Sequence, residues 1–440
     1  MVIADGTLNL LLARWQMALT LGVHIILACF GVGFPILLLA AHALALRGNA
    51  VAGELAYRWS KSFAVLFAVG AVTGTVLSFE LGLLWPGFMG TWGSVIGLPF
   101  TLEGFAFFLE AIFVGIYIYG RQRLPPLVHW WTAVPIALAG IASAWFVVTA
   151  NAWMNSPQGF DWDGVRPINP QPLRAMFNPA MGAQTTHMIL AALMTSGFCS
   201  ASYYAWRILF VADREYERLA LRISLAMACA ITPVQLIVGD WSAKVVAQYQ
   251  PVKFAAMESH FHTESSASLL VGGVPNQQTR QIAWGLRIPY LLSFLAHGDF
   301  HQEVVGLEEF PVDVQPPVIV VHTAFQLMVA CGVLLLGLAL YYFHWVIFRS
   351  RRPLSSKFLY AALPSGLLSV IALEAGWVVT EVGRQPWIVQ GWMKTADAVT
   401  NSDQTHIVFM ATLAIYGALG IGPWITLRQL ARRPLEHAGK

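Results

Sequence analysis

The chain has 440 residues, of which 57% are hydrophobic and only 11% are charged. Soluble globular domains carry about 25% charged residues, so the composition excludes an ordinary soluble protein and favours a membrane protein. The formal net charge of +3 is small and gives no reason to expect nucleic-acid binding.

Nine apolar segments are each long enough to cross a bilayer as a helix of about 20 residues. In chain order they cover roughly residues 15–46, 62–85, 100–120, 130–150, 186–210, 219–239, 318–348, 357–379 and 404–428. The first and seventh exceed the bilayer thickness and are expected to tilt or to extend beyond it. The stretch 8–14 is a candidate for a short interfacial helix. The sequence therefore predicts an all-α polytopic membrane protein with nine transmembrane helices.

Lys and Arg side chains are distributed unevenly between the two sides of these segments. Most of the 26 lie in loops on the side of the C-terminus. They are Arg47, Arg58, Lys61, Arg121, Arg123, Arg207, Arg214, Arg218, Arg222, Arg349, Arg351, Arg352, Lys357, Arg428, Arg432, Arg433 and Lys440. Basic loops stay in the cytoplasm, which predicts a cytoplasmic C-terminus and an N-terminus outside. The first fifteen residues lack the basic start and cleavage site of a signal peptide.

This orientation places three longer loops outside, at 151–185, 240–317 and 380–403. The loop 240–317, between the sixth and seventh helices, is the largest hydrophilic segment. We interpret it as a folded excursion within one membrane domain of residues 1–440. The four cysteines fall in apolar runs without a CxxC or CxxCH motif, which argues against disulfide, zinc and covalent haem sites.

Several residues that a bilayer penalises nevertheless lie inside the predicted helices, and such residues suggest function. At a rise of about 1.5 Å per residue, His24, His187, Met328 and Glu381 are expected in the outer half of the membrane, with His24 some nine residues from the outer end. A His/Met pair is a haem-iron ligand set that raises the reduction potential, whereas a lone His or a carboxylate leaves the iron open to oxygen. The sequence does not establish that His187 and Met328 meet.

Two carboxylates, Glu103 and Glu110, lie seven residues apart and therefore share a helix face. Such a pair is typical of a proton relay, and Glu374 either pairs with a neighbouring helix or serves a haem or a proton route. His322 and His406 carry no motif and are expected to be packing or interfacial residues.

Simpler interpretations accompany several of these assignments. A histidine such as His24 in an apolar helix often only hydrogen-bonds to a neighbour, and Met328 alone would be ordinary core packing. His260 and His262 are expected to be solvated, and Lys253 and Glu258 taken alone would be read as solvated too.

Seven short motifs together resemble subunit I of the cytochrome bd-type quinol oxidases, over nearly the whole chain. The most specific is EAGWVVTEVGRQPW (374–387), which corresponds to the family pattern GWxxxExGRQPW. The others are ARWQMALTLGVH (13–24), TLEGFAFFLEAIF (101–113), SAWFVVTANAWMNSP (143–157), VGDWSAK (238–244), KFAAME (253–258) and FQLMVACG (325–332).

This resemblance implies three haems. His187 and Met328 look like the axial ligands of a low-spin haem b. His24 and Glu381 look like the ligands of the two oxygen-side haems, which are a high-spin haem b and a haem d, or a third haem b in its place. Which of the two residues serves which haem is left open.

The resemblance also implies supporting roles. Trp377 resembles an aromatic neighbour between haems, and Arg384 and Arg14 resemble residues that support haem charge. Lys253 and Glu258 match outer-loop residues tied to quinol oxidation. The pair Glu103 and Glu110 matches carboxylates assigned to proton transfer or to the oxygen-side haems.

The implied function is a terminal oxidase in the bacterial cytoplasmic membrane. It would oxidise ubiquinol or menaquinol outside and reduce O2 to water with cytoplasmic protons, which generates membrane potential without pumping. The implied partners are a second large membrane subunit and, in some family members, a small single-span subunit. Cyanide sensitivity, including a cyanide-insensitive type, is left open.

Two departures from the family pattern stand out. Gln326 replaces an Arg found two residues before the axial Met, which should lower the potential of the low-spin haem or shift its propionate contacts. The outer loop lacks the long insertion of some members and is a short form.

Two other functions remain as alternatives. One is a quinone-linked cytochrome b that passes electrons to a partner, which two bis-His pairs would favour. The other is a secondary transporter, which repeat symmetry and broken helices would favour.

Overall fold

The computed structural model describes residues 5–350 and 352–432. Within these ranges, nine helical segments are long and apolar enough to cross a membrane, which confirms the predicted number. They are α1 (Asp5–Leu46), α2 (Ala50–Leu84), α3 (Pro86–Gly120), the pair α4 (Pro126–Trp131) and α5 (Ala133–Asn155), α7 (Met181–Phe210), α8 (Glu215–Tyr249), α11 (Val318–Arg349), the pair α12 (Ser356–Ala362) and α13 (Ser365–Val382), and α15 (Thr405–Arg432).

Short elements fill the connections. The short helices are α6 (Pro172–Met176), α9 (Pro251–Met257), α10 (Leu291–His297), α14 (Thr395–Ala398) and the 3-10 turns η1 (Leu307–Glu309) and η2 (Val312–Val314). The strands are β1 (Asp161–Trp162), β2 (Pro167–Ile168), β3 (Glu264–Ser265), β4 (Leu269–Val271), β5 (Val274–Asn276), β6 (Gln281–Ala283), β7 (Leu286–Ile288), β8 (Glu303–Val304), β9 (Trp387–Val389) and β10 (Met393–Lys394). Every sheet among the described residues has two strands, and the two strands are antiparallel.

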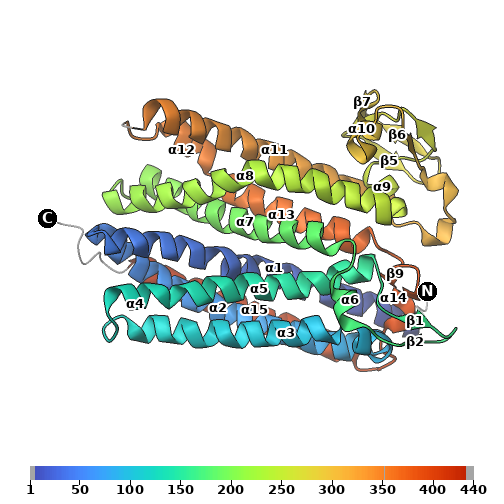
Figure 1. The fold of residues 1–440 in the computed structure, drawn as a ribbon, viewed down its shortest axis with the longest axis horizontal. Helices are drawn as coiled ribbons and strands as arrows, with labels where there is room; N and C mark the ends of the chain where they lie inside the picture. The colour runs from blue at the N-terminus through green and yellow to red at the C-terminus, as the bar shows by residue number, and fades with distance from the viewer. Residues whose placement is uncertain (1–4, 351, 433–440) are drawn as a thin grey trace.

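The long helices run side by side along one axis, and the strands gather at one end of the bundle (Figure 1). In the view, α7, α8, α11 and α13 form the upper part, and α1, α2, α3, α5 and α15 form the lower part. Contacts of α1 and α5 with α7 join the two parts. Since the beginning of α1 lies at the end with the strands, that end is the predicted outer side.

Several helices extend further toward this end than hydropathy predicts. The candidate interfacial helix 8–14 is wrong, because these residues belong to the continuous helix α1. Helix α3 begins at Pro86, before the predicted start at residue 100, and α8 continues to Tyr249 through residues assigned to the outer loop. Hydropathy reports the apolar thickness of a bilayer, and a helix that continues into water carries polar residues such as Asp240 and Lys244.

The loop after α8 folds back over the bundle and is anchored by histidines. His322 is fully buried and contacts the carbonyl oxygens of Met257 (2.7 Å) and Gly272 (3.2 Å), so the packing role predicted for it is confirmed. His260 is also buried, with Nε2 3.0 Å from the carbonyl oxygen of Val304, so the solvated position expected for it is wrong.

Gln326 provides a further tie between α11 and this loop. Its Oε1 accepts a hydrogen bond from the backbone N–H of Gly272 (3.0 Å), and its Nε2 donates to the carbonyl of Leu270 (3.1 Å). The amide that replaces the family's arginine therefore holds the short outer loop.

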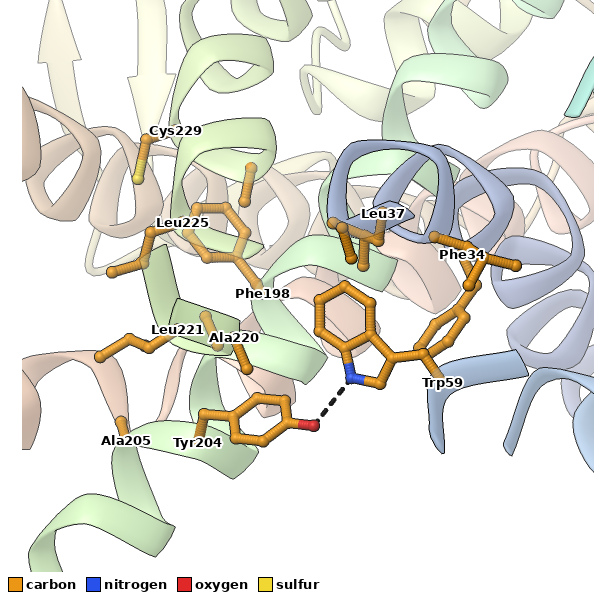
Figure 2. Close-up of a cluster of buried hydrophobic side chains, with 14 of the residues drawn as sticks. Phe34, Leu37, Trp59, Phe198, Tyr204, Ala205, Ala220, Leu221, Leu225 and Cys229 are labelled. Carbon is orange, nitrogen blue, oxygen red and sulfur yellow. Dashed lines mark hydrogen bonds between the residues drawn. The ribbon is translucent and has the colours of Figure 1, made fainter. Parts of the chain in front are cut away.

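The opposite end of the bundle is a closely packed apolar core (Figure 2). Phe34, Trp59, Phe198 and Tyr204 are all buried there, and Trp59 Nε1 donates to the Tyr204 hydroxyl at 2.7 Å. Burying large aromatic side chains removes much apolar surface, and the contact with Tyr204 satisfies the indole N–H of Trp59. This end fixes the relative positions of α1, α2, α7 and α8.

Candidate functional site

A cavity of about 480 Å³ lies between α7, α8, α11 and α13, toward the outer end, with α9 and β4 at its edge. Ligand cavities of proteins usually measure about 300–1,000 Å³, so a cofactor fits this space. Its lining includes five residues singled out from the sequence, namely His187, Lys253, Glu258, Met328 and Trp377. Four sequence segments far apart in the chain therefore meet at one place.

The cavity exists because small residues line these four helices. Among them are Ala183, Ala191, Gly239, Ala243, Gly332 and Gly376. A Cβ atom at Gly239 would lie 3.4 Å from His187 Cε1, and one at Gly376 would lie 3.1 Å from Met328 Sδ. The two glycines thus leave room for the imidazole and the thioether against the neighbouring helices.

The donors of this cavity fit a low-spin haem. An imidazole from α7 and a thioether from α11 are a haem-iron ligand set, and most of the lining is apolar, as a porphyrin requires. Gln235 Nε2 lies 3.4 Å from both ring nitrogens of His187, so the ring has no short competing hydrogen bond within the described part of the chain.

His24 lies outside this cavity, on α1, and faces α2. Its Nδ1 is 2.9 Å from the Thr73 hydroxyl oxygen, whose own hydrogen is donated to the carbonyl of Gly70 (3.0 Å). Because that hydrogen is committed, Thr73 accepts and His24 Nδ1 donates, which leaves the lone pair on Nε2. A hydrogen bond at one ring nitrogen commonly orients a histidine for metal binding at the other. Since α1 begins at Asp5, His24 lies deeper along the helix than the predicted nine residues.

Glu381 stands in the last turn of α13, and both of its carboxylate oxygens accept hydrogen bonds. Asn151 Nδ2 donates to Oε1 (2.5 Å), and Arg384 donates to Oε2 (2.6 Å). Arg384 is 4% exposed, and its Nε and Nη1 have no partner among residues 5–350 and 352–432. A buried guanidinium with two free donors is costly unless an anion is bound. A haem propionate fits this requirement.

Arg14 occupies a different kind of place from Arg384. It is exposed, and its Nη2 donates to Gln385 Oε1 at 2.9 Å. Thr395 donates to the same oxygen at 3.0 Å. Arg14 therefore holds the turn after α13, next to Glu381 and Arg384, and does not line the cavity.

The two loop residues of the cavity are both buried, at 5% exposure for Lys253 and 6% for Glu258. Burial lowers the pKa of Lys253 to about 7, and the nearby Arg384 acts in the same direction while Glu381 opposes it. Burial raises the pKa of Glu258 to about 8. Both groups are therefore able to exchange protons near neutral pH, and the solvated interpretation of these two residues is wrong.

The carboxylates of α3 face α5. Ser143 donates to Glu103 Oε1 at 3.2 Å. Glu110 is buried, and its Oε1 lies against the backbone at Gly140 and has no hydrogen-bond partner among the described residues. Glu374, on α13, lies against α1 at Gly22, and its Oε1 is equally buried and unpartnered within those residues.

Three polar residues of this region escape detection in the sequence. Asn151 and Thr73 look like ordinary helix residues, and only the fold places them on Glu381 and His24. Glu80 is 3% exposed and accepts from Gln16 (2.8 Å) and Thr20 (2.6 Å). A carboxylate inside an apolar helix is a signal that would have identified Glu80.

The fold and the cavity define a class of protein, a polytopic helical bundle whose interior offers imidazole, thioether and carboxylate donors at separate places. A family model for cytochrome bd terminal oxidase subunit I matches residues 12–435. The chain therefore belongs to that family. Membership makes it part of a quinol:O2 oxidoreductase, a multi-pass protein of the bacterial inner membrane, and implies haem cofactors and a complex with a second subunit.

Individual relatives agree with this assignment. The chain is 34% identical, over 98% of both sequences, to a Bacillus subtilis protein provisionally named cytochrome bd menaquinol oxidase subunit I. It is 29% identical to the cytochrome bd-II ubiquinol oxidase subunit 1 of Escherichia coli, over 96% of both. It is also similar to the solved bd oxidase of Geobacillus thermodenitrificans, with a TM-score of 0.92 and 40% identity over 98% of this chain and 100% of the other.

Proposed function

We propose that this chain carries the haems and the quinol site of a terminal oxidase that oxidises quinol on the outer side and reduces O2 to water. The observation that carries the proposal is the single cavity lined by His187, Met328, Lys253 and Glu258. It combines a haem-iron ligand pair with two buried groups that exchange protons near neutral pH, and quinol oxidation requires both.

The haem ligands divide among separate places. His187 and Met328 hold a low-spin haem b, while His24 and Glu381 each hold one oxygen-side haem, a high-spin haem b and a haem d or a b-type replacement. Bound haem supplies one-electron transfer and oxygen binding. Arg384 offers two free donors to a propionate, Trp377 covers the cavity wall, and Arg14 steadies the turn that carries Arg384.

Lys253 and Glu258 accept the two protons of the bound quinol. The neutral amine and the ionised carboxylate are the accepting forms, and pKa values of about 7 and about 8 make both available at physiological pH. Their burial excludes bulk water, so the substrate hydroxyls are their natural partners. The loop 240–317 thereby becomes the quinol-binding loop, and either ubiquinol or menaquinol is the substrate.

Protons for water formation come from the cytoplasm along Glu110 and Glu103 on α3. The two carboxylates lie seven residues apart on one helix face, and Glu110 is buried with one oxygen free. Release outside and uptake inside separate charge across the membrane without a pump, given a cytoplasmic C-terminus. A second large subunit and a small single-span subunit are the proposed partners in the bilayer.

The test is a reduced-minus-oxidised optical spectrum of the purified complex, recorded with and without carbon monoxide, beside quinol-driven O2 consumption. We expect a low-spin haem b signal that carbon monoxide does not change, and a second haem signal that carbon monoxide shifts. A far-red chlorin band would show that one oxygen-side haem is haem d. Absence of that band would indicate a form that contains only b-type haems. Haem without any response to carbon monoxide would support the quinone-linked cytochrome b, and a colourless protein would contradict the proposal.

A further inference from the structure

One side-chain hydrogen bond joins Lys253, in the wall of the cavity, to Asn155, in the wall of a second hollow. Lys253 lines the cavity described above, and its Nζ donates to Asn155 Oδ1 at 2.6 Å. Asn155 in turn lines a second hollow of about 290 Å³, together with Tyr249, Gln390 and Trp392. One hydrogen bond therefore spans the wall between the proposed quinol site and the second hollow.

The amide of Asn155 is fixed in one orientation. It is 1% exposed, and its Nδ2 donates to the carbonyl oxygen of Asn151 (3.0 Å) and approaches Asn151 Oδ1 (3.4 Å). Asn151 is held in its own place by Gln184, whose Nε2 donates to Asn151 Oδ1 at 2.6 Å. Because the donor end of Asn155 is committed to α5, its oxygen is directed at Lys253.

The second hollow opens to the outer surface. Two of its lining residues, Tyr249 and Trp392, are 43% and 42% exposed. The side chains of Asn155, Gln158 and Gln390 supply polar groups to its wall. A space of this size with several polar partners holds water. On the other side of Asn155, the cavity is lined mostly by apolar residues.

From this arrangement we infer that Asn155 is a positioning residue that holds the Lys253 amine behind the inner wall of the second hollow, and that this hollow is the exit for protons released by quinol. The inference rests on the proposed oxidation of quinol in the cavity. It adds an exit route for the quinol protons, which neither the haem ligands nor Glu258 provides.

The proton balance is simple. When quinol is oxidised, its O–H bond breaks and an N–H bond forms on the neutral Lys253 amine, while a haem that His187 and Met328 would hold would supply the electron acceptor. The resulting ammonium gives its proton, past Asn155, to water that enters from the hollow and returns to the neutral amine. The charged or titratable groups around Lys253 are Arg384 and Glu381 at the end of α13, Tyr249 at the end of α8 and Glu258 after α9.

Two substitutions at one position should move the pH profile in opposite directions. Asn155→Leu removes the acceptor that favours the ammonium form, so the acid limb of kcat/KM for a short-chain ubiquinol should move to lower pH by about one pH unit. Asn155→Asp places a carboxylate beside the amine, so the same limb should move to higher pH. In the whole complex, both variants should keep the low-spin signal, and Asn401→Leu on the exposed outer surface is the matched control.

A third variant tests the hollow itself. Gln390→Leu removes a polar wall group without touching Lys253, so it should lower kcat and raise the solvent isotope effect while the acid limb stays in place. If the acid limbs of Asn155→Leu and Asn155→Asp move in the same direction, or if neither moves, the role of Asn155 is wrong. An unchanged kcat in Gln390→Leu would overturn the exit through the second hollow. If a leucine variant loses its haem signals, the isosteric Asn155→Asp variant decides alone.

Failure of this inference is distinct from failure of the proposed function. Lys253→Met in the same complex should remove the part of the acid limb near pH 7 and leave the part that Glu258 contributes near pH 8. If Lys253→Met behaves as the unmodified protein, the quinol role of the lysine is wrong. If Lys253→Met is slow while both Asn155 variants are normal, quinol oxidation stands and only the exit route is wrong.

Discussion

The same helices α7, α8 and α11 are packed in two opposite ways at their two ends. Toward the strands they carry Ala and Gly and enclose a cavity, whereas toward the other end they carry Phe198, Tyr204 and Trp345 in a closely packed core (Figure 2). The difference shows that one bundle can have a rigid, closely packed end and a separate end that is open for binding. The aromatic end holds the helices at a fixed spacing, and this spacing keeps the small-residue end open for a cofactor.

Filling the cavity should produce the largest effect. Ala191→Phe places an aromatic ring in the space between α7 and the other helices, as at the opposite end of α7. We expect complete loss of the low-spin haem signal and of quinol oxidation, with the helical content unchanged in circular dichroism. Ala414→Phe on the exposed face of α15 is the matched control and should keep both. A retained low-spin signal in Ala191→Phe would show that the haem lies elsewhere.

Emptying the core is the complementary change. Phe198 is fully buried in the apolar core, and truncating such a ring costs about 3–5 kcal/mol. Phe198→Ala should therefore lower the thermal unfolding midpoint of the complex markedly while the haem spectrum of the folded fraction stays normal. A normal unfolding midpoint with altered haem bands would contradict the claim that the aromatic end stabilises the fold and the other end binds the cofactor.

Glu110→Gln keeps the size of the side chain and removes its proton. If the carboxylate relays protons, turnover should fall about a hundredfold, the lower range for a lost acid–base group, with haem content intact. Oxygen consumption per haem is the measurement, and Glu215→Gln at the exposed start of α8 is the control. Unchanged turnover would remove Glu110 from the path.

A smaller effect should appear in the pH dependence of the unmodified enzyme. Lys253 accepts a proton only when neutral, and Glu258 only when ionised, so both lose their accepting forms as the pH falls below about 7 and about 8. We expect kcat/KM for quinol to rise at least tenfold from pH 6 to pH 8, because Lys253 alone, with a pKa of about 7, passes from mostly protonated to mostly neutral over this range. A flat profile would mean that neither group takes the proton.

The number of helices and the cavity residues were predictable because both depend on local patterns. Length and hydropathy reveal nine spans, the motif segments contain Met328, Lys253 and Glu258, and His187 stands out as a histidine inside a predicted transmembrane helix. Helix ends were not predictable in the same way, since α8 continues with polar residues that hydropathy treats as loop, and the early turns of α3 pack Phe88 and Trp92 into a buried cluster that only the fold reveals.

Hydrogen-bond partners on neighbouring helices could not be predicted from the sequence. Nothing local indicates that Thr73 faces His24 or that Asn151 and Asn155 join Glu381 to Lys253. These contacts depend on the rotation and register of packed helices, which a single sequence does not specify. His260 was misjudged for the same reason, because its burial depends on a loop folding back over α9.

The central claim is that the cavity between α7, α8, α11 and α13 holds a low-spin haem between His187 and Met328, and the reduced-minus-oxidised spectrum of Met328→Leu tests it most directly. Leucine has a similar volume and no sulfur, so the fold should persist. We predict loss of the sharp low-spin bands, a new response to carbon monoxide at the opened iron, and an unchanged signal from the oxygen-side haems. An unaltered low-spin spectrum would contradict the assignment of this cavity.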